Sequence, residues 1–242
     1  MALHFIVDSP DQLVGDSVAL TGPEAHHAAA VRRVRVGETV TLGDGLGAWV
    51  TGVVTAVAAK RVDIVLESRR HIEEHTPRIV LVQALAKGDR DERAVEAATE
   101  LGVSAIVPWQ AARSVSRWDA AKIAKGVARW QSIAREASKQ AHRAWVPTVS
   151  DPVTTAQLAA RATDVSVVVL EPSAAGALTA LELPLDRDVW LVVGPEGGMT
   201  PEELDTLEDA GATLARMGTT VLRTSTAGPA ALAALSVVLG RW

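Results

Sequence analysis

A glutamate lies inside a glycine-rich loop that joins an apolar run to a helical pattern. The stretch is VVGPEGGMTPEELDTL, residues 192–207. Glycine loops that open helices usually bind phosphate, because free backbone N–H groups and the helix dipole attract anions. Here Thr200 is expected to cap the helix, with Glu203 as its capping-box partner. Because this helix start is satisfied internally and Glu196 and Glu202 add negative charge, the loop fits a neutral or cationic ligand better than phosphate.

A second loop of small and hydroxylated residues, MGTTVLRTSTAG at 217–228, precedes an apolar helical pattern that begins near Pro229. A helix that is apolar on all sides must be buried in the core or against a second subunit. Both loops follow apolar runs typical of parallel strands, and open α/β sheets bind ligands at the carboxyl ends of their strands. Together with the LEPS segment at 170–173, the loops predict one composite pocket.

Other kinds of site find little support in the sequence. The adjacent His26 and His27 lack a spaced Asp, Glu, His or Cys partner, so no metal site is expected. Neither the G-x-S-x-G elbow of serine hydrolases nor a P-loop pattern occurs. The chain has no cysteine, which excludes disulfides, thiolate metal sites and cysteine nucleophiles.

The composition is typical of a cytoplasmic protein. Hydrophobic residues make up 48% of the 242 residues, but charged residues interrupt them throughout, so no membrane span is expected. The N-terminal stretch MALHFIVDSPDQ has neither a basic region followed by an apolar one nor a small-residue cleavage site. We therefore expect no secretory signal and no membrane partner.

The total net charge of −5 hides a basic segment. Residues 111–145 carry eight basic and two acidic side chains, a local net charge of +6, whereas residues 1–110 and 146–242 carry −4 and −7. On a helix over 118–145, apolar residues fill one sector and basic residues another. This basic stripe predicts contact with an anion or RNA, with a solvated surface as the alternative. The stripe comprises Lys122, Lys125, Arg129, Lys139 and Arg143.

The pattern of the chain changes near residue 72. Residues 1–72 alternate short β-rich runs with turns, as in a small barrel or sandwich, and GDGLG at 43–47 fits a hairpin turn better than a dinucleotide-binding loop. Farther on, continuous apolar runs typical of buried parallel strands alternate with helical patterns such as 89–102. We expect a β domain over 1–72 and an α/β domain over 73–242.

Four blocks follow one another along the second domain: LAKGDRDERAVEAATELGVSAIVPW, WQSIAREASKQAHRAWVP, GPEGGMTPEEL and MGTTVLRTSTA. With HHAAAVRRVRVGE near the N-terminus, they resemble the conserved blocks of the bacterial 16S ribosomal RNA uridine N3-methyltransferases. These form the ribosomal RNA small subunit methyltransferase E family of the SPOUT superfamily. The resemblance covers nearly the whole chain, and the blocks together are highly specific.

The resemblance implies a PUA-like β-barrel that docks RNA and a SPOUT-type α/β domain whose last segment forms a trefoil knot. It also implies S-adenosyl-L-methionine as cofactor, a homodimer, and methylation of N3 of a uridine in 16S ribosomal RNA of the small subunit. Two alternatives stay open. One is another SPOUT RNA methyltransferase, acting on a ribose 2′-OH or on tRNA. The other is a non-catalytic RNA-binding protein of ribosome assembly.

The resemblance also implies site residues. N3 of uracil must lose a proton before it attacks, so we expect Arg223 to stabilise the developing charge and Glu196 to act as base or to orient the cofactor. Ser225 stands where the family usually has Glu. The expected cofactor-binding residues are Leu170, Glu171, Gly194, Pro195, Glu196, Gly197, Gly198, Met217, Gly218, Leu222, Thr224 and Thr226. The expected RNA-binding residues are His26, His27, Arg32, Arg33, Arg35, Arg113, Arg117 and the basic stripe.

Overall fold

The computed structural model describes residues 2–242, and its contacts divide the chain into two units. The first unit contains the chain up to Glu74 together with Ser138–Val146. The second contains His75–Ala137 and Pro147–Trp242. The segment Ser138–Val146 therefore belongs with the N-terminal residues, which a single division of the sequence near residue 72 does not anticipate.

The first unit is built on a five-stranded sheet with the strand order β1-β3-β4-β5-β2. Strands β1 and β3 are parallel, and the other neighbours are antiparallel. The predicted hairpin turn at 43–47 is confirmed: the Asp44 carboxylate accepts the N–H groups of Leu46 and Ala48 between β3 and β4. The elements are β1 Leu3–Ile6, a 3-10 helix Pro10–Leu13, β2 Ser17–Thr21, α1 Gly22–His26, a π-helical turn His27–Val31, β3 Thr39–Gly43, β4 Ala48–Ala58 and β5 Arg61–His71.

A buried histidine lies on β1 in this unit. Nδ1 of His4 is 2.9 Å from Oγ1 of Thr41, and the His4 ring stacks on Trp49 with the ring centroids 4.5 Å apart. Burial lowers the pKa of His4 to about 4, with repulsion from His142 as the next cause. The ring is therefore neutral in the folded protein at physiological pH.

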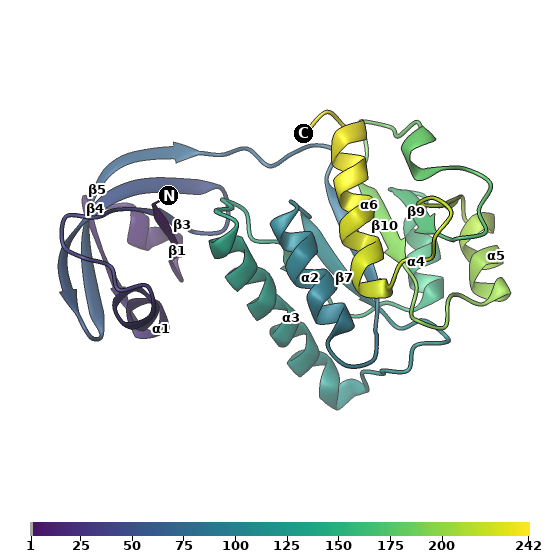
Figure 1. Ribbon diagram of the computed structural model, residues 1–242, viewed down its shortest axis with the longest axis horizontal. Helices are drawn as coiled ribbons and strands as arrows, with labels where there is room; N and C mark the ends of the chain where they lie inside the picture. Colours follow the sequence, from purple (N-terminus) through teal and green to yellow (C-terminus); the bar gives the residue numbers. More distant parts are fainter. Residues whose placement is uncertain (1) are drawn as a thin grey trace. The chain divides into compact units, whose positions relative to one another are not determined.

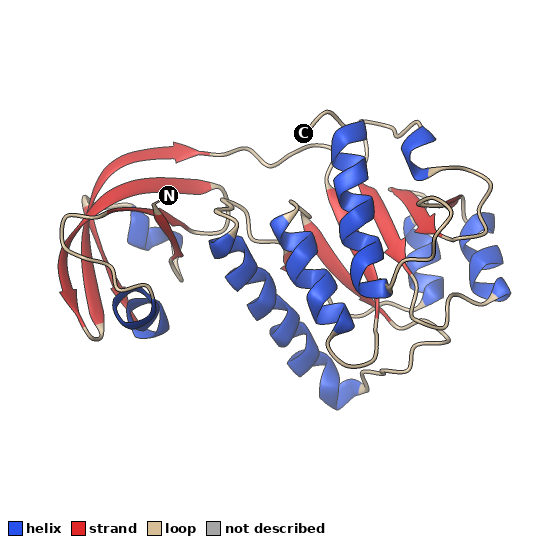
Figure 2. Ribbon diagram, viewed as in Figure 1, coloured by secondary structure: helices blue, strands red, loops and turns tan. Residues whose placement is uncertain are grey.

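The second unit is a three-layer α/β/α sandwich around a parallel sheet of order β11-β9-β10-β6-β7-β8 (Figures 1 and 2). The continuous apolar runs form these strands because both faces of the sheet are covered. Along β6, Ile79 and Leu81 pack against α2, α3 and α6, whereas Val80 and Val82 pack against α4 and α5. The predicted α/β class is confirmed.

The second unit's elements follow the predicted order. The strands are β6 Ile79–Ala84, β7 Ala105–Trp109, β8 Thr148–Val149, β9 Ser166–Leu170, β10 Val189–Val193 and β11 Thr213–Ala215. The helices are α2 Arg90–Glu100, α3 Ala120–Gln140, α4 Thr155–Arg161, a 3-10 helix Leu178–Ala180, α5 Pro201–Asp209 and α6 Thr224–Val238.

Two helix boundaries differ from those predicted. Helix α3 ends at Gln140 rather than near residue 145, because His142 adopts a φ of 54° and the N–H of Arg143 donates to the Ser138 carbonyl. Helix α6 begins at Thr224, five residues before the predicted start, with Pro229 inside it. The apolar α6 is buried at residues such as Leu232 and Leu235, but Val237 in its last turn is 60% exposed.

Candidate active site

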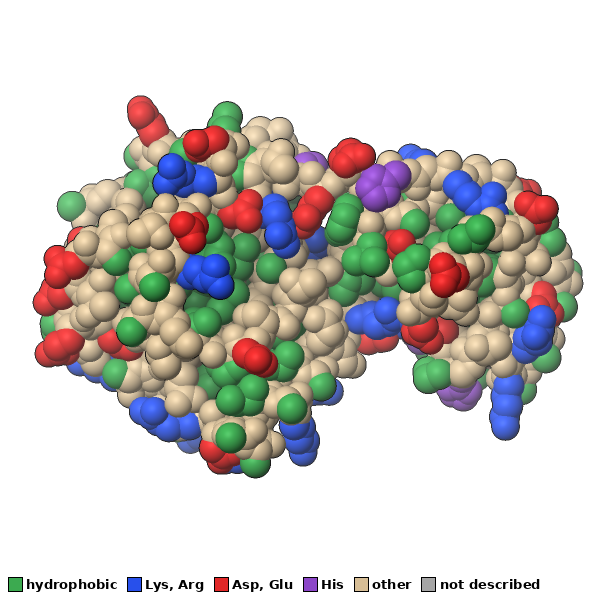
Figure 3. All heavy atoms as spheres, turned by 180° about the vertical axis from the view of Figure 1, so that it is seen from behind, with side chains coloured by type: hydrophobic (Ala, Val, Ile, Leu, Met, Phe, Trp, Pro, Cys, Tyr) green, Lys and Arg blue, Asp and Glu red, His purple; other side chains and the backbone are tan. Residues whose placement is uncertain are grey.

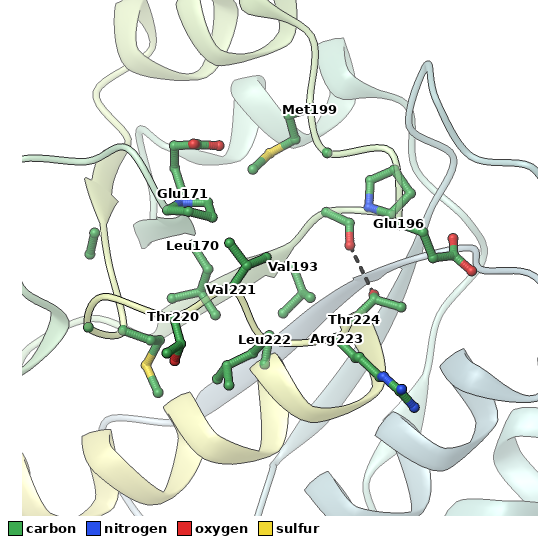
Figure 4. Close-up of a pocket in the computed structure, with 18 of the residues that line it drawn as sticks. Leu170, Glu171, Val193, Glu196, Met199, Thr220, Val221, Leu222, Arg223 and Thr224 are labelled. Atoms are coloured by element: carbon green, nitrogen blue, oxygen red, sulfur yellow. Dashed lines mark hydrogen bonds between the residues drawn. The ribbon is translucent and has the colours of Figure 1, made fainter.

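A pocket of about 530 Å³ lies at the carboxyl ends of β9 and β10, beside the start of α6 (Figure 4). The structure brings together there residues of the three segments that the sequence singled out. The sequence-predicted residues that line it are Leu170, Glu171, Gly194, Pro195, Glu196, Gly198, Met217, Gly218, Leu222, Arg223 and Thr224.

Gly197 and Thr226 are not among the described residues that line this pocket. Gly197 faces Arg113 instead, since a Cβ built on it would lie 3.4 Å from the Cβ of Arg113. The pocket also contains residues that the sequence reasoning missed. Some of them lie at or just after the carboxyl ends of predicted strands, and this position could have identified them as pocket residues. These further residues are Arg90, Pro172, Val193, Met199, Ala215, Thr220, Val221 and Ala227.

The pocket combines an apolar floor with a glycine-containing rim. Leu170, Val193 and Leu222 face one another across its interior, and Met199 lies opposite them (Figure 4). Glycine at 198 is required by the backbone, because its φ of 68° is rarely adopted by other residues. Such a cavity fits an organic ligand with a large apolar surface and a few polar groups.

Glu196 does not point into this cavity but away from it (Figure 4). Its Oε1 accepts the side-chain N–H of Arg90 at 2.6 Å and the backbone N–H of Lys87 at 3.0 Å. Burial raises the pKa of Glu196, but hydrogen bonds from its own backbone, from Arg90 and from Lys87 outweigh it, so the pKa lies below the ordinary value. The carboxylate is therefore charged, paired and weakly basic.

Arg113, an expected RNA-binding residue, is directed at the same loop. Its Nη1 donates to the carbonyl oxygens of Gly197 and Met199, each at 3.1 Å. The side chain thus holds the loop between β10 and α5 at two carbonyls beyond Glu196. A charged donor on two carbonyls fixes the loop more firmly than a neutral one.

A buried network attaches the third pocket segment. The Gln83 amide nitrogen donates to Oγ1 of Thr224 at 2.8 Å, and that hydroxyl donates to the Gly194 carbonyl at 2.9 Å. Gln83 is fully buried on β6. The first turn of α6 is therefore tied both to the central strand and to the start of the glycine loop.

The predicted capping box of α5 is confirmed, and it extends further than the sequence indicated. Thr200 Oγ1 accepts the Glu203 N–H, and Glu203 Oε2 accepts the Thr200 N–H. The other oxygen, Oε1, accepts the Ala112 N–H at 2.8 Å and the Thr155 hydroxyl at 3.0 Å. Buried Glu203 thereby joins the loop, the segment after β7 and the start of α4.

Arg223 occupies the N-cap position of α6 and its side chain is exposed. It extends from the pocket's rim away from the apolar floor (Figure 4). Ser225, which replaces the family's usual Glu, is half-buried in the first turn of α6. The structure thus places an exposed cation at the rim of the pocket.

The expected RNA-binding residues of the first unit lie in and after a short helical segment. His26 ends α1, His27 begins the π-helical turn, and the arginines follow it. All except half-buried His27 are exposed. The three arginines are Arg32, Arg33 and Arg35.

The basic stripe is shorter than predicted. Lys122, Lys125 and Arg129 are exposed on α3. Lys139 is buried and pairs with Glu24 at 3.1 Å. Arg143 is half-buried beyond the helix end, where burial lowers its pKa to about 10. Lys139 and Arg143 therefore do not extend the exposed stripe, because the helix ends early and this segment packs in the first unit.

Acidic side chains gather along the edge of the second unit that carries α5, as Figure 3 shows. RNA is repelled from such an edge, so the exposed cations of α3 remain the expected contact. Within residues 2–242, no helix is long and apolar enough to cross a membrane. The same residues contain no cluster of three or more metal-ligating side chains.

Comparison with known proteins identifies both parts of the chain. Residues 73–236 match the model of an RNA methyltransferase domain, and residues 20–67 match that of an RNA methyltransferase PUA domain. The ribosomal RNA small subunit methyltransferase E of Mycobacterium tuberculosis is 41% identical, with 100% of this chain and 94% of the relative covered. The Bacillus subtilis protein of that name is 34% identical, with 98% and 96% covered.

Solved structures show the same α/β methyltransferase fold with a PUA-like domain. The ribosomal RNA small subunit methyltransferase E from Neisseria gonorrhoeae bound to S-adenosyl methionine has a TM-score of 0.88 at 28% identity, with 98% of each chain covered. A Legionella pneumophila structure in complex with the bound cofactor SAM has a TM-score of 0.86 at 28% identity, again with 98% of each chain covered. The chain therefore belongs to the ribosomal RNA small subunit methyltransferase E family.

Proposed function

We propose that this protein is an S-adenosyl-L-methionine-dependent methyltransferase that methylates N3 of one uridine in the 16S ribosomal RNA of the small subunit. The observation that carries the proposal is the pocket formed by the loop after β10 and the loop before α6. Family membership supports it, since relatives are named ribosomal RNA small subunit methyltransferase E and a similar structure is bound to S-adenosyl methionine.

The pocket fits the cofactor in size and chemistry. Its volume of about 530 Å³ lies within the roughly 300–1,000 Å³ of small-molecule sites. Leu170, Val193 and Leu222 would cover the apolar part of the ligand, and glycine backbone would allow its close approach. When bound, S-adenosyl-L-methionine supplies a methyl group on a positively charged sulfur. With Glu196 already paired to Arg90, the loop presents no uncompensated charge to it.

We propose that Glu196 orients the cofactor loop rather than acting as the base. Its lowered pKa supports this role, because a carboxylate held in its charged form is a weak base, and its two hydrogen bonds tie it to Arg90 and Lys87. Arg223 is proposed to stabilise negative charge on the uracil oxygens as N3 loses its proton. Its exposed position at the pocket's rim leaves the guanidinium accessible to an entering base.

The decisive experiment incubates unmethylated small ribosomal subunits with labelled S-adenosyl-L-methionine and maps the modified nucleotide. Label at N3 of a single uridine supports the proposal. Label on a ribose 2′-OH, or transfer only to tRNA, identifies a different methyltransferase. Binding of the cofactor without transfer to any RNA indicates a non-catalytic factor. In the same assay, Arg223→Ala is expected to slow transfer about 100-fold, and near-normal turnover would remove Arg223 from the mechanism.

We propose that RNA is held by the N-terminal domain, residues 1–72, and by the exposed cations of α3. Phosphate contacts release counterions, so binding is expected to weaken steeply with salt. Neutralising Lys122, Lys125 and Arg129 together should flatten that dependence. An unchanged slope would leave the stripe as a solvated surface.

Three finer features of the family are part of the proposal. The segment that starts α6 is proposed to form a trefoil knot, in which its hydrogen bonds to Gln83 and Gly194 would fix it against β6 and the glycine loop. The N-terminal sheet is proposed to close as a barrel. A homodimer is proposed because α6 leaves Val237 and Val238 exposed, and light scattering would test it. A ribosomal substrate implies that the protein acts in the cytoplasm.

A further inference from the structure

A second hollow lies in the methyltransferase unit, outside the cofactor pocket. Its volume is about 580 Å³, and three segments of the unit line it. They are residues 86–92, which lead into α2, residues 116–118 and the first half of α3. The segments beside it also hold the cofactor loop, since Lys87 and Arg113 both donate hydrogen bonds to that loop. The segment 86–92 therefore contributes to both sites, since it contains Arg90, which lines the cofactor pocket.

Four cations line the hollow together with two carboxylates, those of Glu92 and buried Asp91. Arg117, Lys122, Lys125 and Arg129 all contribute, and all four are exposed. Among residues 2–242, Lys125 forms no ion pair within 4.0 Å. The pair between Lys122 and Asp119 is solvent-exposed on both sides, so it is weak and can exchange for a phosphate contact.

The guanidinium fork of Arg129, its Nε and Nη2 groups, is paired with a carboxylate of the same chain. Its Nε lies 3.1 Å from Oε1 of Glu92, and its Nη2 lies 2.8 Å from Oε2. This two-point contact is the arrangement with which arginine also binds a phosphate. Glu92 therefore holds the place that a phosphate group would take, and it competes with one.

A tryptophan lies in the same hollow. The Trp118 ring packs over Gly126, where a Cβ would come within 2.6 Å of the ring, so the glycine is needed for this close approach. Its centroid is 5.2 Å from that of Trp130, with the planes at 71°. Trp130 is buried, but Trp118 is only half-buried and keeps part of its ring accessible. An accessible indole beside cations is the usual platform for an unpaired base.

We propose that this hollow, lined by Trp118 and the four cations, binds one unpaired nucleotide of the RNA strand that flanks the target uridine. Its base stacks on Trp118, and its phosphate displaces Glu92 from Arg129. The inference rests on the proposed function for the identity of the RNA, but the binding itself can be tested without any methyl transfer. An acidic peptide would use the cations and leave Trp118 without a role.

The test uses the full chain and a fluorescein-labelled single-stranded RNA 12-mer. Lys125→Gln should lower the slope of log affinity against log salt by about 0.7. Trp118→Leu should weaken binding about tenfold. Glu92→Gln should tighten binding, because it frees the Arg129 fork. Arg187→Gln is the control, because it removes an exposed charge of the same unit outside the hollow. It should leave both the RNA affinity and its salt dependence close to the wild-type values.

The outcomes test RNA binding in the hollow independently of the proposed methyl transfer. Calorimetry with S-adenosyl-L-methionine should give wild-type affinity for all four variants. Wild-type RNA binding by both Lys125→Gln and Trp118→Leu would overturn the proposal, as would a loss of affinity in Glu92→Gln. Lys125 is exposed, so its variant remains informative if Trp118→Leu unfolds. Weaker RNA binding by Lys125→Gln with wild-type binding by Trp118→Leu would also overturn it, because the cations would then bind an anion without a stacked base. If small subunits are not methylated but the variants behave as expected, only the proposed function fails.

Discussion

Nη1 of Arg90 lies 2.6 Å from Oε1 of Glu196, although the two residues are 106 positions apart in the sequence. The pair joins the first residue of α2 to the loop between β10 and α5. Because the same oxygen also accepts the Lys87 N–H, the carboxylate is fixed from two directions. The negative charge in the glycine loop is therefore balanced inside the protein.

Substituting this pair should affect cofactor binding more than the methyl-transfer step. Arg90→Gln and Glu196→Gln each remove one charge and loosen the loop, so we expect an S-adenosyl-L-methionine Kd about tenfold higher with a smaller change in kcat. Calorimetry measures the first quantity and single-turnover transfer the second. If Glu196→Gln instead lowered kcat about 100-fold or more at unchanged cofactor affinity, Glu196 would be the base.

Arg113 is expected to act on the cofactor rather than on RNA. Arg113→Gln loses the charged hydrogen bonds to Gly197 and Met199, so cofactor affinity should fall about tenfold while affinity for the RNA 12-mer changes little. Arg117→Gln is the matched comparison from the same segment. It should weaken RNA binding and leave cofactor affinity unchanged, and the reverse pattern would contradict both assignments.

Glu203 should contribute to stability. In Glu203→Gln one acceptor oxygen is lost, and the new NH₂ group would face either the Thr200 N–H or the Ala112 N–H. An unpaired buried group costs about 1–3 kcal/mol, so the free energy of unfolding should fall by that amount. Urea denaturation measures it. Glu202→Gln changes an exposed neighbouring carboxylate, and an equal loss there would show that the cause is charge rather than the buried bonds.

His4 should make the stability of the N-terminal unit depend on pH. Its folded pKa of about 4 lies below the ordinary histidine value of 6.5, so the unfolded chain takes up the proton first as the pH falls. The free energy of unfolding should therefore decrease by up to about 3 kcal/mol between pH 6.5 and pH 4, with no further loss from this group below pH 4.

His4→Phe provides the test, because it keeps an aromatic ring over Trp49 but cannot titrate. The variant should lose less stability than the wild type when the pH is lowered from 7 to 4.5. His75→Phe, at an exposed position, serves as the control and should retain the wild-type pH dependence. If the free energy of unfolding decreased equally with falling pH in the wild type and in His4→Phe, His4 would be excluded as the cause.

Local sequence patterns were sufficient to predict much of the second unit. Continuous apolar runs marked its buried parallel strands, and Thr200 with Glu203 marked the start of α5, because both signals depend on residues within one element. The end of α3 was missed because His142 takes a positive φ without the glycine that usually signals it.

Long-range partners could not be read from the sequence. Lys139 fits a basic stripe by its helical position, but it is buried because Glu24, 115 residues away, pairs with it. The contact of Arg113 with Gly197, 84 residues away, likewise has no signal in the local sequence. Periodicity indicates which face of a helix a residue occupies, but not which distant segment covers that face.

The contacts of Glu203 also bear on the order in which the chain is assembled during synthesis. Ala112, Thr155 and Thr200, the residues that its carboxylate joins, all precede it in the sequence. A chain that emerges N-terminus first therefore presents every partner before Glu203 itself appears. The loop that lines the cofactor pocket can then be fixed as soon as α5 forms, before the residues of α6 have been added.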